Sequence, residues 1–221
     1  MKVGTDGVLL GAWIAANQPQ RILDIGTGCG LIALMLAQRF PSAIVDAVDI
    51  EIAAAEEARS NFDQSPWSNR LSAMTGDIRS IELRRTYSLI VTNPPWYDTE
   101  MKSTNPSRSL ARHADALGPD DLAARVAELL DSDGRFCVIL PIDKAQRLIS
   151  AALDHELHLI RQTAVRPKPS KPAHRLLMEF SRQQVPHGES VPAGELIVET
   201  EVRHDYTPEF RSLLKDFFLR F

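Results

Sequence analysis

A buried strand, a glycine-rich turn and a helix follow one another near the start of the chain, and this succession restricts the fold more than any other feature. Residues 21–25 (RILDI) have the length and composition of a buried strand, residues 26–30 (GTGCG) form the turn, and residues 31–37 (LIALMLA) predict a helix. The order is typical of an open α/β sheet, in which ligands bind beyond the carboxyl ends of the strands. We therefore expect a ligand at this turn.

The spacing within the turn indicates the kind of ligand. It differs from the GxGxxG of dinucleotide binders, and a P-loop would need Gly-Lys-Ser/Thr, so a pyrophosphate is not indicated. Glycines let the backbone approach a ligand closely, the helix N-terminus favours a carboxylate, and Asp24 could meet an ammonium. A ligand with an amino-acid moiety would suit both. The alternative, a tight turn that needs glycine, explains one or two of Gly26, Gly28 and Gly30 but not the whole pattern.

Two further acids stand where strands are expected to end. Asp49 follows a strand predicted over residues 43–48 and lies 23 residues after Gly26, close to the roughly 20-residue offset of an acid that receives ribose hydroxyls. Asp49 could also be the N-cap of the next helix. Asp77 follows a short strand at residues 71–75, where it could accept an adenine amino group, although such a residue is more often part of a turn.

A fourth apolar run, residues 87–92 (YSLIVT), ends in Asn93-Pro94-Pro95-Trp96. The Asn93 side-chain carbonyl and the Pro94 backbone carbonyl are two acceptors, and Trp96 offers a face for stacking. A planar NH₂ group on an aromatic ring could donate to both acceptors, which would stabilise positive charge as it develops on the nitrogen. The alternative is a strand that stops at a Pro-Pro turn with a core tryptophan.

Length and composition exclude several classes of protein. A chain of 221 residues with 44% apolar residues can bury a sizeable core. The only two cysteines, Cys29 and Cys137, lie far apart and outside any Cys/His cluster, so we expect no metal site and no disulfide framework. No apolar stretch approaches the roughly 20 residues needed to span a bilayer, and no signal peptide is apparent. We therefore predict a cytoplasmic protein without membrane segments.

Charge is distributed unevenly. The net charge is −4, but residues 102–113 and 161–182 together carry nine bases and one acid, which leaves −12 on the rest. Basic segments on an acidic body suggest a local phosphate-contacting surface, although two solvated loops would look the same. The proline-stiffened arm in the second segment is the first candidate for this contact. The candidate contacts are Lys102, Arg108, Arg112, Arg166, Lys168, Lys171 and Arg175.

We expect one domain over residues 1–221, with a helix in residues 1–20, a core in 21–155 and an antiparallel part in 156–221. The first helix should use Thr5 or Asp6 as its N-cap, and because it begins so abruptly we expect an upstream segment. Strands are predicted over residues 157–165, 175–180 and 195–202, with antiparallel pairing at one end of the sheet. Residues 206–210 should cap a last helix that packs on the sheet.

These motifs, in this order, resemble the class I S-adenosylmethionine-dependent methyltransferases across essentially the whole chain. The resemblance implies a Rossmann-like fold with seven strands, mostly parallel with one antiparallel strand, and helices on both faces. It also implies S-adenosylmethionine as cofactor. The implied cofactor contacts are Thr5, Asp24, Gly26, Gly28, Asp49, Asp77 and Asn93.

A narrower resemblance rests on residues 2–13 (KVGTDGVLLGAW), residues 206–210 (YTPEF) and the FFL of residues 217–219. These are similar to the bacterial tRNA(Val) adenine-N6 methyltransferases, which modify adenine 37. The resemblance implies tRNA as partner, Asn93 and Pro94 as acceptors for the adenine amine beside Pro95, and Trp96 as the stacking residue. Trp96 departs from the tyrosine commoner there. Family members also usually begin before the segment that opens this chain.

Other functions remain open from sequence. A protein glutamine N5-methyltransferase would use the same acceptors on a side-chain amide and would not need the basic segments. A DNA adenine methyltransferase is chemically possible, but no sizeable target-recognition domain is apparent. A cofactor- or RNA-binding protein without turnover, because of a truncated start, is the non-enzymatic alternative. The oligomeric state is not indicated.

Overall fold

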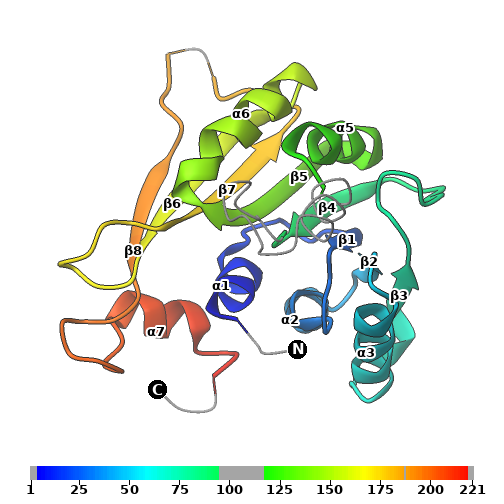
Figure 1. Cartoon of the computed structure of the whole chain (residues 1–221), viewed down its shortest axis with the longest axis horizontal. Coiled ribbons are helices and arrows are strands. Elements are labelled where there is room, and N and C mark those ends of the chain that lie inside the picture. Colours follow the sequence, from blue (N-terminus) through cyan, green and yellow to red (C-terminus); the bar gives the residue numbers. More distant parts are fainter. Residues whose placement is uncertain (1–3, 95–116, 187, 219–221) are drawn as a thin grey trace, which may run out of the picture.

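The computed structural model describes residues 4–94, 117–186 and 188–218, which form one eight-stranded sheet flanked by helices (Figure 1). The order across the sheet is β3-β2-β1-β4-β5-β7-β6-β8. The strands are β1 (Arg21–Ile25), β2 (Ile44–Asp49), β3 (Leu71–Thr75), β4 (Tyr87–Thr92), β5 (Leu130–Pro141), β6 (His158–Arg166), β7 (Arg175–Ser181) and β8 (Ala193–Ile197). The helices are α1 (Thr5–Trp13), α2 (Leu31–Arg39), α3 (Ile52–Asp63), α5 (Pro119–Leu129), α6 (Ala145–Asp154) and α7 (Pro208–Leu214), with the 3₁₀ turns η1 (Ser68–Arg70) and η2 (Ile142–Lys144).

The sheet is mostly parallel. Strands β3, β2, β1, β4 and β5 pair in parallel, and β7 runs antiparallel to both β5 and β6. The predicted fold class is therefore confirmed, but the predicted count of seven strands is wrong. The seventh strand along the chain, β7, is the one reversed strand. An eighth strand, β8, pairs in parallel with β6, although antiparallel pairing was predicted for this part of the chain.

The carboxyl ends of the parallel strands lie together along one edge of the sheet. Because β7 reverses direction between β5 and β6, strand β6 points the same way as β1, β4 and β5. Ile25, Thr92 and Arg166, the last residues of β1, β4 and β6, therefore lie at this edge, which we call the carboxyl edge. Ligands of open α/β sheets bind at such an edge.

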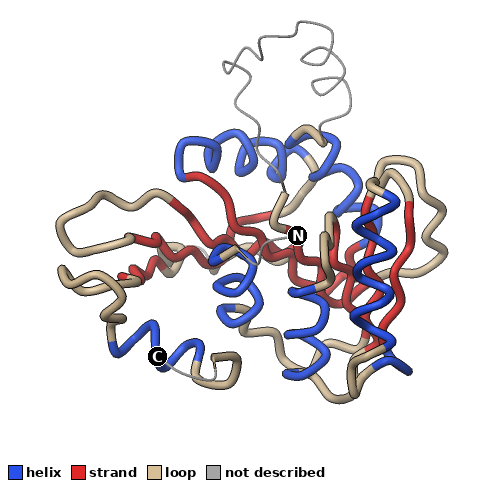
Figure 2. Tube along the Cα trace, turned by 60° about the horizontal axis from the view of Figure 1, so that its bottom comes forward, coloured by secondary structure: helices blue, strands red, loops and turns tan. Residues whose placement is uncertain are grey.

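Two apolar cores lie on opposite faces of the sheet, and Figure 2 shows helices on both sides of it. One core contains residues of α1, α2, α3 and α7, and the other contains residues of α5 and α6. Strand β1 serves both, because Ile22 belongs to the first core and Leu23 to the second, each with no exposed surface. Burial on both faces explains why β1 reads as a continuous apolar run.

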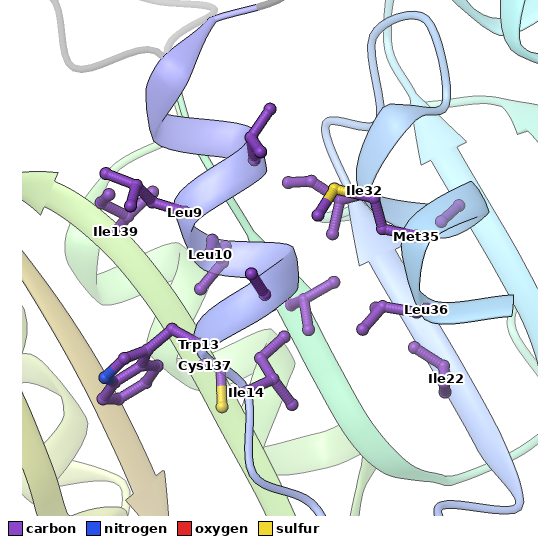
Figure 3. Packing of buried hydrophobic residues seen from close by; sticks show 14 of the residues in the cluster. Leu9, Leu10, Trp13, Ile14, Ile22, Ile32, Met35, Leu36, Cys137 and Ile139 are labelled. Carbon is purple, nitrogen blue, oxygen red and sulfur yellow. The ribbon is translucent and has the colours of Figure 1, made fainter. Parts of the chain in front are cut away.

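Helix α1 is held tightly between α2 and the sheet, and Figure 3 shows Leu9 beside Ile139 and the helix beside Ile32 and Met35 of α2. A Cβ at Gly11 would lie 2.9 Å from the Met35 sulfur, so glycine permits this close approach. Trp13 Nε1 donates to Thr163 Oγ1 at 2.9 Å. The chain following α1 therefore reaches β1 from a fixed position.

Two expectations for the helix ends have different outcomes. The N-cap of α1 is Gly4, with no side-chain cap bond, so neither Thr5 nor Asp6 caps it. Asp6 instead accepts from Arg175 Nε at 2.7 Å, a contact 169 positions away in sequence. Helix α7 is capped as predicted, because Thr207 Oγ1 accepts from Phe210 N–H at 3.2 Å. It contacts α1 and β8.

None of the helices that the structure describes is both long enough and apolar enough to cross a bilayer.

Candidate active site

The predicted ligand turn and the Asn-Pro motif meet at the carboxyl edge. In the parallel pairing of β1 with β4, Ile25 is the partner of Thr92. Gly26 and Asn93, which follow them, therefore begin adjacent loops. Pro94 is buried and Asn93 is half-buried. Pro95, Trp96, Lys102, Arg108 and Arg112 lie outside the described residues.

Thr92 ties these two loops together. Its side chain has no exposed surface, and its hydroxyl donates to the Ile25 carbonyl at 2.8 Å. The residue before Asn93 is thereby fixed to the residue before Gly26. Sequence reasoning missed this contact, because a threonine at a strand end has many other uses.

The glycines of the turn have two different reasons to be glycine. Gly26, Gly28 and Gly30 all have positive φ, at 70°, 58° and 83°, which disfavours side chains. At Gly30 a Cβ would lie 2.5 Å from Phe62 Cε1, so this glycine makes room for α3. At Gly26 a Cβ would meet nothing within 4 Å. Gly26 is therefore the glycine that leaves backbone open toward a ligand.

Asp49 organises the turn from the end of β2. One carboxylate oxygen accepts from Gly28 N–H at 2.8 Å and the other from Glu51 N–H at 3.0 Å. Glu51, not Asp49, is the N-cap of α3, and its side chain makes no cap bond. Asp49 is only 9% exposed. Each of its oxygens keeps a lone pair that a ribose hydroxyl could use.

Asp24 lies beneath the turn and is fully buried. Its Oδ2 accepts from the Thr27 hydroxyl at 2.6 Å, whereas its Oδ1 is buried without a hydrogen-bond partner. Burial raises the pKa of Asp24 from 3.8 to about 7, against the lowering effect of the Thr27 hydrogen bond. A ligand ammonium cannot reach a carboxylate with no exposed surface directly. We therefore infer that Asp24 affects a bound ligand indirectly, by holding the turn through Thr27 and by placing a negative charge beneath it.

Asp77 is at the same edge, after β3, and is already paired. Both of its oxygens accept from the guanidinium of Arg79, at distances from 2.6 to 3.0 Å, and this hydrogen bonding lowers the pKa of Asp77. The preceding Gly76 N–H donates to the Asp49 carbonyl at 2.9 Å, so the loop is fixed next to the end of β2. An adenine amino group would have to share Asp77 with Arg79.

Thr5 is exposed in the first turn of α1, and the Asp6–Arg175 ion pair places that turn near the start of β7 at the carboxyl edge.

The other end of α1 is held by Arg39, which sequence reasoning missed. Its guanidinium donates to the carbonyls of Gly11 and Ile14, each at 2.6 Å. Burial lowers the pKa of Arg39.

The basic arm, which we define as residues 166–174, follows β6 at the carboxyl edge and is not free. Arg166 donates to its own loop at the Lys171 carbonyl at 2.8 Å and pairs with Glu195 at 3.3 Å. Lys168 lies 3.8 Å from Glu199. Lys171 is exposed. The predicted phosphate contacts of the arm thus lie at the carboxyl edge, and Arg166 and Lys168 are partly paired with acids of other elements.

Another polar feature lies at the opposite edge of the sheet. A groove of about 530 Å³ is found where β2, β3 and β4 begin, and there Asp46 accepts from Tyr87 at 3.0 Å and from Ser72 at 2.6 Å. Burial and Asp46 raise the pKa of Tyr87. In the part of the chain that the structure describes, no three His, Cys, Asp or Glu side chains gather as a metal site would require.

The groups at the carboxyl edge fit an amino-acid-bearing nucleoside. Gly26 leaves open space, Asp49 presents oxygens beside the turn, and the orphaned Asp24 Oδ1 keeps a negative charge beneath it when ionised. S-adenosylmethionine combines a ribose, an ammonium and a sulfonium, so it matches this set of acceptors.

Known proteins share this fold. The profile described as methyltransferase small domain matches residues 3–140. The structure of a predicted O-methyltransferase from Agrobacterium tumefaciens superposes with a TM-score of 0.70, at 19% identity, over 96% of both chains. A glycopeptide N-methyltransferase solved with S-adenosylmethionine superposes with a TM-score of 0.57, at 12% identity, over 80% of this chain and 94% of that one.

The fold and the site define a class I S-adenosylmethionine-dependent methyltransferase. A relative from Vibrio campbellii named tRNA1(Val) (adenine(37)-N6)-methyltransferase is 42% identical over 220 residues, which cover 100% of this chain and 90% of that protein. A relative of the same name from Trichodesmium erythraeum is 41% identical, with coverage of 100% and 92%. The chain belongs to this methyltransferase family.

Proposed function

We propose that this enzyme methylates the N6 amine of an adenine in tRNA, adenine 37 of tRNA(Val), and that it does so in the cytoplasm. One observation carries the proposal: the Asn93-Pro94 pair begins beside the glycine turn, at the carboxyl edge, in a chain about 40% identical to relatives named for this reaction. The pair supplies acceptors for an aromatic amine, and the turn supplies the place for the methyl donor.

In this proposal Asn93 and Pro94 act on the nitrogen. The Asn93 side-chain oxygen and the Pro94 carbonyl accept the two N6 hydrogens and favour a pyramidal nitrogen with an available lone pair. They also stabilise the positive charge that develops on the amine, so no strong base is needed and the proton leaves afterwards. Bound S-adenosylmethionine supplies an electrophilic methyl group for in-line displacement. Thr92 keeps the acceptors aligned with the turn.

The cofactor contacts are assigned by what each residue offers. Gly26 provides a close backbone approach, Gly28 holds Asp49 against the turn through its N–H, and Asp49 provides acceptors for the ribose. Asp24 favours the cationic ligand through its charge beneath the turn. Asp77 is proposed for the adenine amine of the cofactor, and Thr5 for the open side of the turn.

For the tRNA, the target base must leave its stack to reach Asn93. Trp96, which lies outside the described residues, is the proposed platform on which the extruded adenine stacks. The basic arm, at the same edge as Asn93, is the proposed phosphate contact.

The test compares Asn93→Ala with Asn69→Ala, an exposed asparagine in the groove at the opposite edge. Asn93→Ala should lose methyl transfer to tRNA by at least about 100-fold, since the acceptor that stabilises the charge developing on N6 is removed, and its affinity for S-adenosylmethionine should change far less. Asn69→Ala should behave as the wild type. Near-normal transfer by Asn93→Ala would overturn the proposal, and so would transfer to a termination-factor protein in place of tRNA.

A further inference from the structure

The basic arm contacts an acidic stretch of the same chain, residues 195–201, which consists of the last three residues of β8 and the four residues after it. Ser170 is the centre of this contact. Its backbone N–H donates to one carboxylate oxygen of Glu201 at 2.8 Å, and its hydroxyl donates to the other at 2.9 Å. Lys168 Nζ lies 3.3 Å from the Glu201 carbonyl oxygen and 3.8 Å from the Glu199 carboxylate.

This arrangement has the chemistry of an oxyanion site. Two donors from one residue hold both oxygens of one anion, and a lysine stands nearby, as in sites that bind phosphate. Ser170, Lys171 and Glu201 are all exposed, so the anion is not sealed in. Residues 166–175 contain four Lys or Arg residues and no Asp or Glu, so every acid at the arm comes from another element.

The position of the arm in the sheet suits contact with an RNA bound at Asn93. The arm follows β6, and β6 is separated from β4 by β7 and β5. Three strand spacings amount to roughly 15 Å between β4 and β6. The contact of Ser170 with Glu201 lies beyond β6, on the side of β8, at a separation that a folded nucleic acid held at the active site can span. Asn93 and the arm both lie at the carboxyl edge.

We propose that Ser170, Lys168 and Lys171 form a subsite for a backbone phosphate of the RNA, and that Glu201 occupies this subsite in the free enzyme. The proposal rests on the proposed function, because it requires a nucleic-acid substrate. RNA binding exchanges the Glu201 carboxylate for a phosphate, and Glu201 is therefore a competitor that weakens RNA binding. If Glu201 only held the arm in place, removing its charge would instead loosen the arm and weaken RNA binding.

The variant Glu201→Gln separates these two roles. Glutamine keeps an oxygen that can accept from Ser170 but removes the charge. Glu189→Gln is the matched control, because Glu189 is exposed in the loop between β7 and β8, at the opposite edge, and loses the same charge. Ser170→Ala removes the hydroxyl donor and leaves Glu201 in place.

The measurement is fluorescence anisotropy with a labelled anticodon stem-loop RNA of tRNA(Val), across a series of salt concentrations. Glu201→Gln should bind about 3- to 10-fold more tightly than wild type at low salt, and the gain should shrink as salt rises. Glu189→Gln should change affinity less than about twofold, and Ser170→Ala should weaken it. The affinity for S-adenosylmethionine should be unchanged in all three.

Equal or weaker RNA binding by Glu201→Gln, or an equal gain in Glu189→Gln, would overturn the subsite. The outcome is distinguishable from failure of the proposed function, which methyl transfer by the wild type decides. If the wild type methylates the tRNA and Glu201→Gln binds no tighter than Glu189→Gln, only the subsite is wrong.

Discussion

Two glycines of one turn should respond differently to the same substitution. Gly30→Ala places a Cβ 2.5 Å from Phe62 Cε1 and 2.9 Å from its Cζ, and Phe62 is only 1% exposed and cannot move aside. Gly26→Ala places a Cβ where nothing lies within 4 Å. Both residues have positive φ, so alanine raises the free energy of the backbone at either position. The difference in stability between the two variants therefore measures the clash with Phe62.

The magnitudes follow from these contacts. A side chain in the left-handed region costs about 1–2 kcal/mol at either glycine. Overpacking against Phe62 adds about 1–3 kcal/mol at Gly30 alone. Gly30→Ala should therefore lower the free energy of unfolding by about 2–5 kcal/mol and Gly26→Ala by about 1–2 kcal/mol.

Urea unfolding measures the loss of stability in both variants. Calorimetric titration with S-adenosylmethionine measures their affinity for the cofactor. Gly26→Ala should weaken cofactor binding although it is the more stable variant, because its Cβ enters the ligand's space. In the double variant Gly30→Ala/Phe62→Leu the two losses should not add, since the smaller side chain relieves the clash. Equal stability losses in the two glycine variants, or wild-type cofactor affinity in Gly26→Ala, would refute this account of the turn.

Substitutions at three further residues test contacts around the site. Asp24 has a pKa of about 7 when folded and 3.8 as its ordinary value, so the folded state binds more protons between these pH values. The stability of the wild type should therefore fall relative to Asp24→Asn as pH rises from about 4 to 7, by at most roughly 1.4 kcal/mol per pH unit, and the difference should level off above pH 7 in urea titrations. Arg39→Met should lower the free energy of unfolding by about 2–4 kcal/mol, since two buried carbonyls lose charged donors; a loss below 1 kcal/mol would contradict the role of Arg39 as an anchor of α1. Thr92→Val should lower kcat by about tenfold with little change in the cofactor KM, and Thr92→Ser should restore it; a change in KM alone would show that Thr92 does not align the acceptors.

The sequence predicted the parts of this fold that depend on local pattern. Strands β1 and β4 are buried almost throughout, so their apolar runs mark them without any need for alternation. The glycine spacing marked the turn, and Asp49 was found by its offset from Gly26. The structure then placed Asp49 against the turn itself through the Gly28 N–H.

What the sequence could not predict depends on distant contacts. The residues around Asp6 predict an N-cap, but its carboxylate accepts a hydrogen bond from Arg175 instead. No residue close to Asp6 in sequence indicates that partner. Strand β8 is exposed over most of its length, so its pairing with the free edge of β6 has no local signature. The basic arm appears unopposed in sequence because its acids, such as Glu195 and Glu201, come from another element.

The most direct test of the central claim is to identify the methylated product. Unmodified tRNA(Val) is incubated with the enzyme and S-adenosylmethionine, digested, and examined by mass spectrometry of nucleosides and of mapped fragments. The account predicts N6-methyladenosine at adenine 37, dependent on Asn93. A methyl group on another nucleoside, or on protein glutamine with none on tRNA, would contradict it.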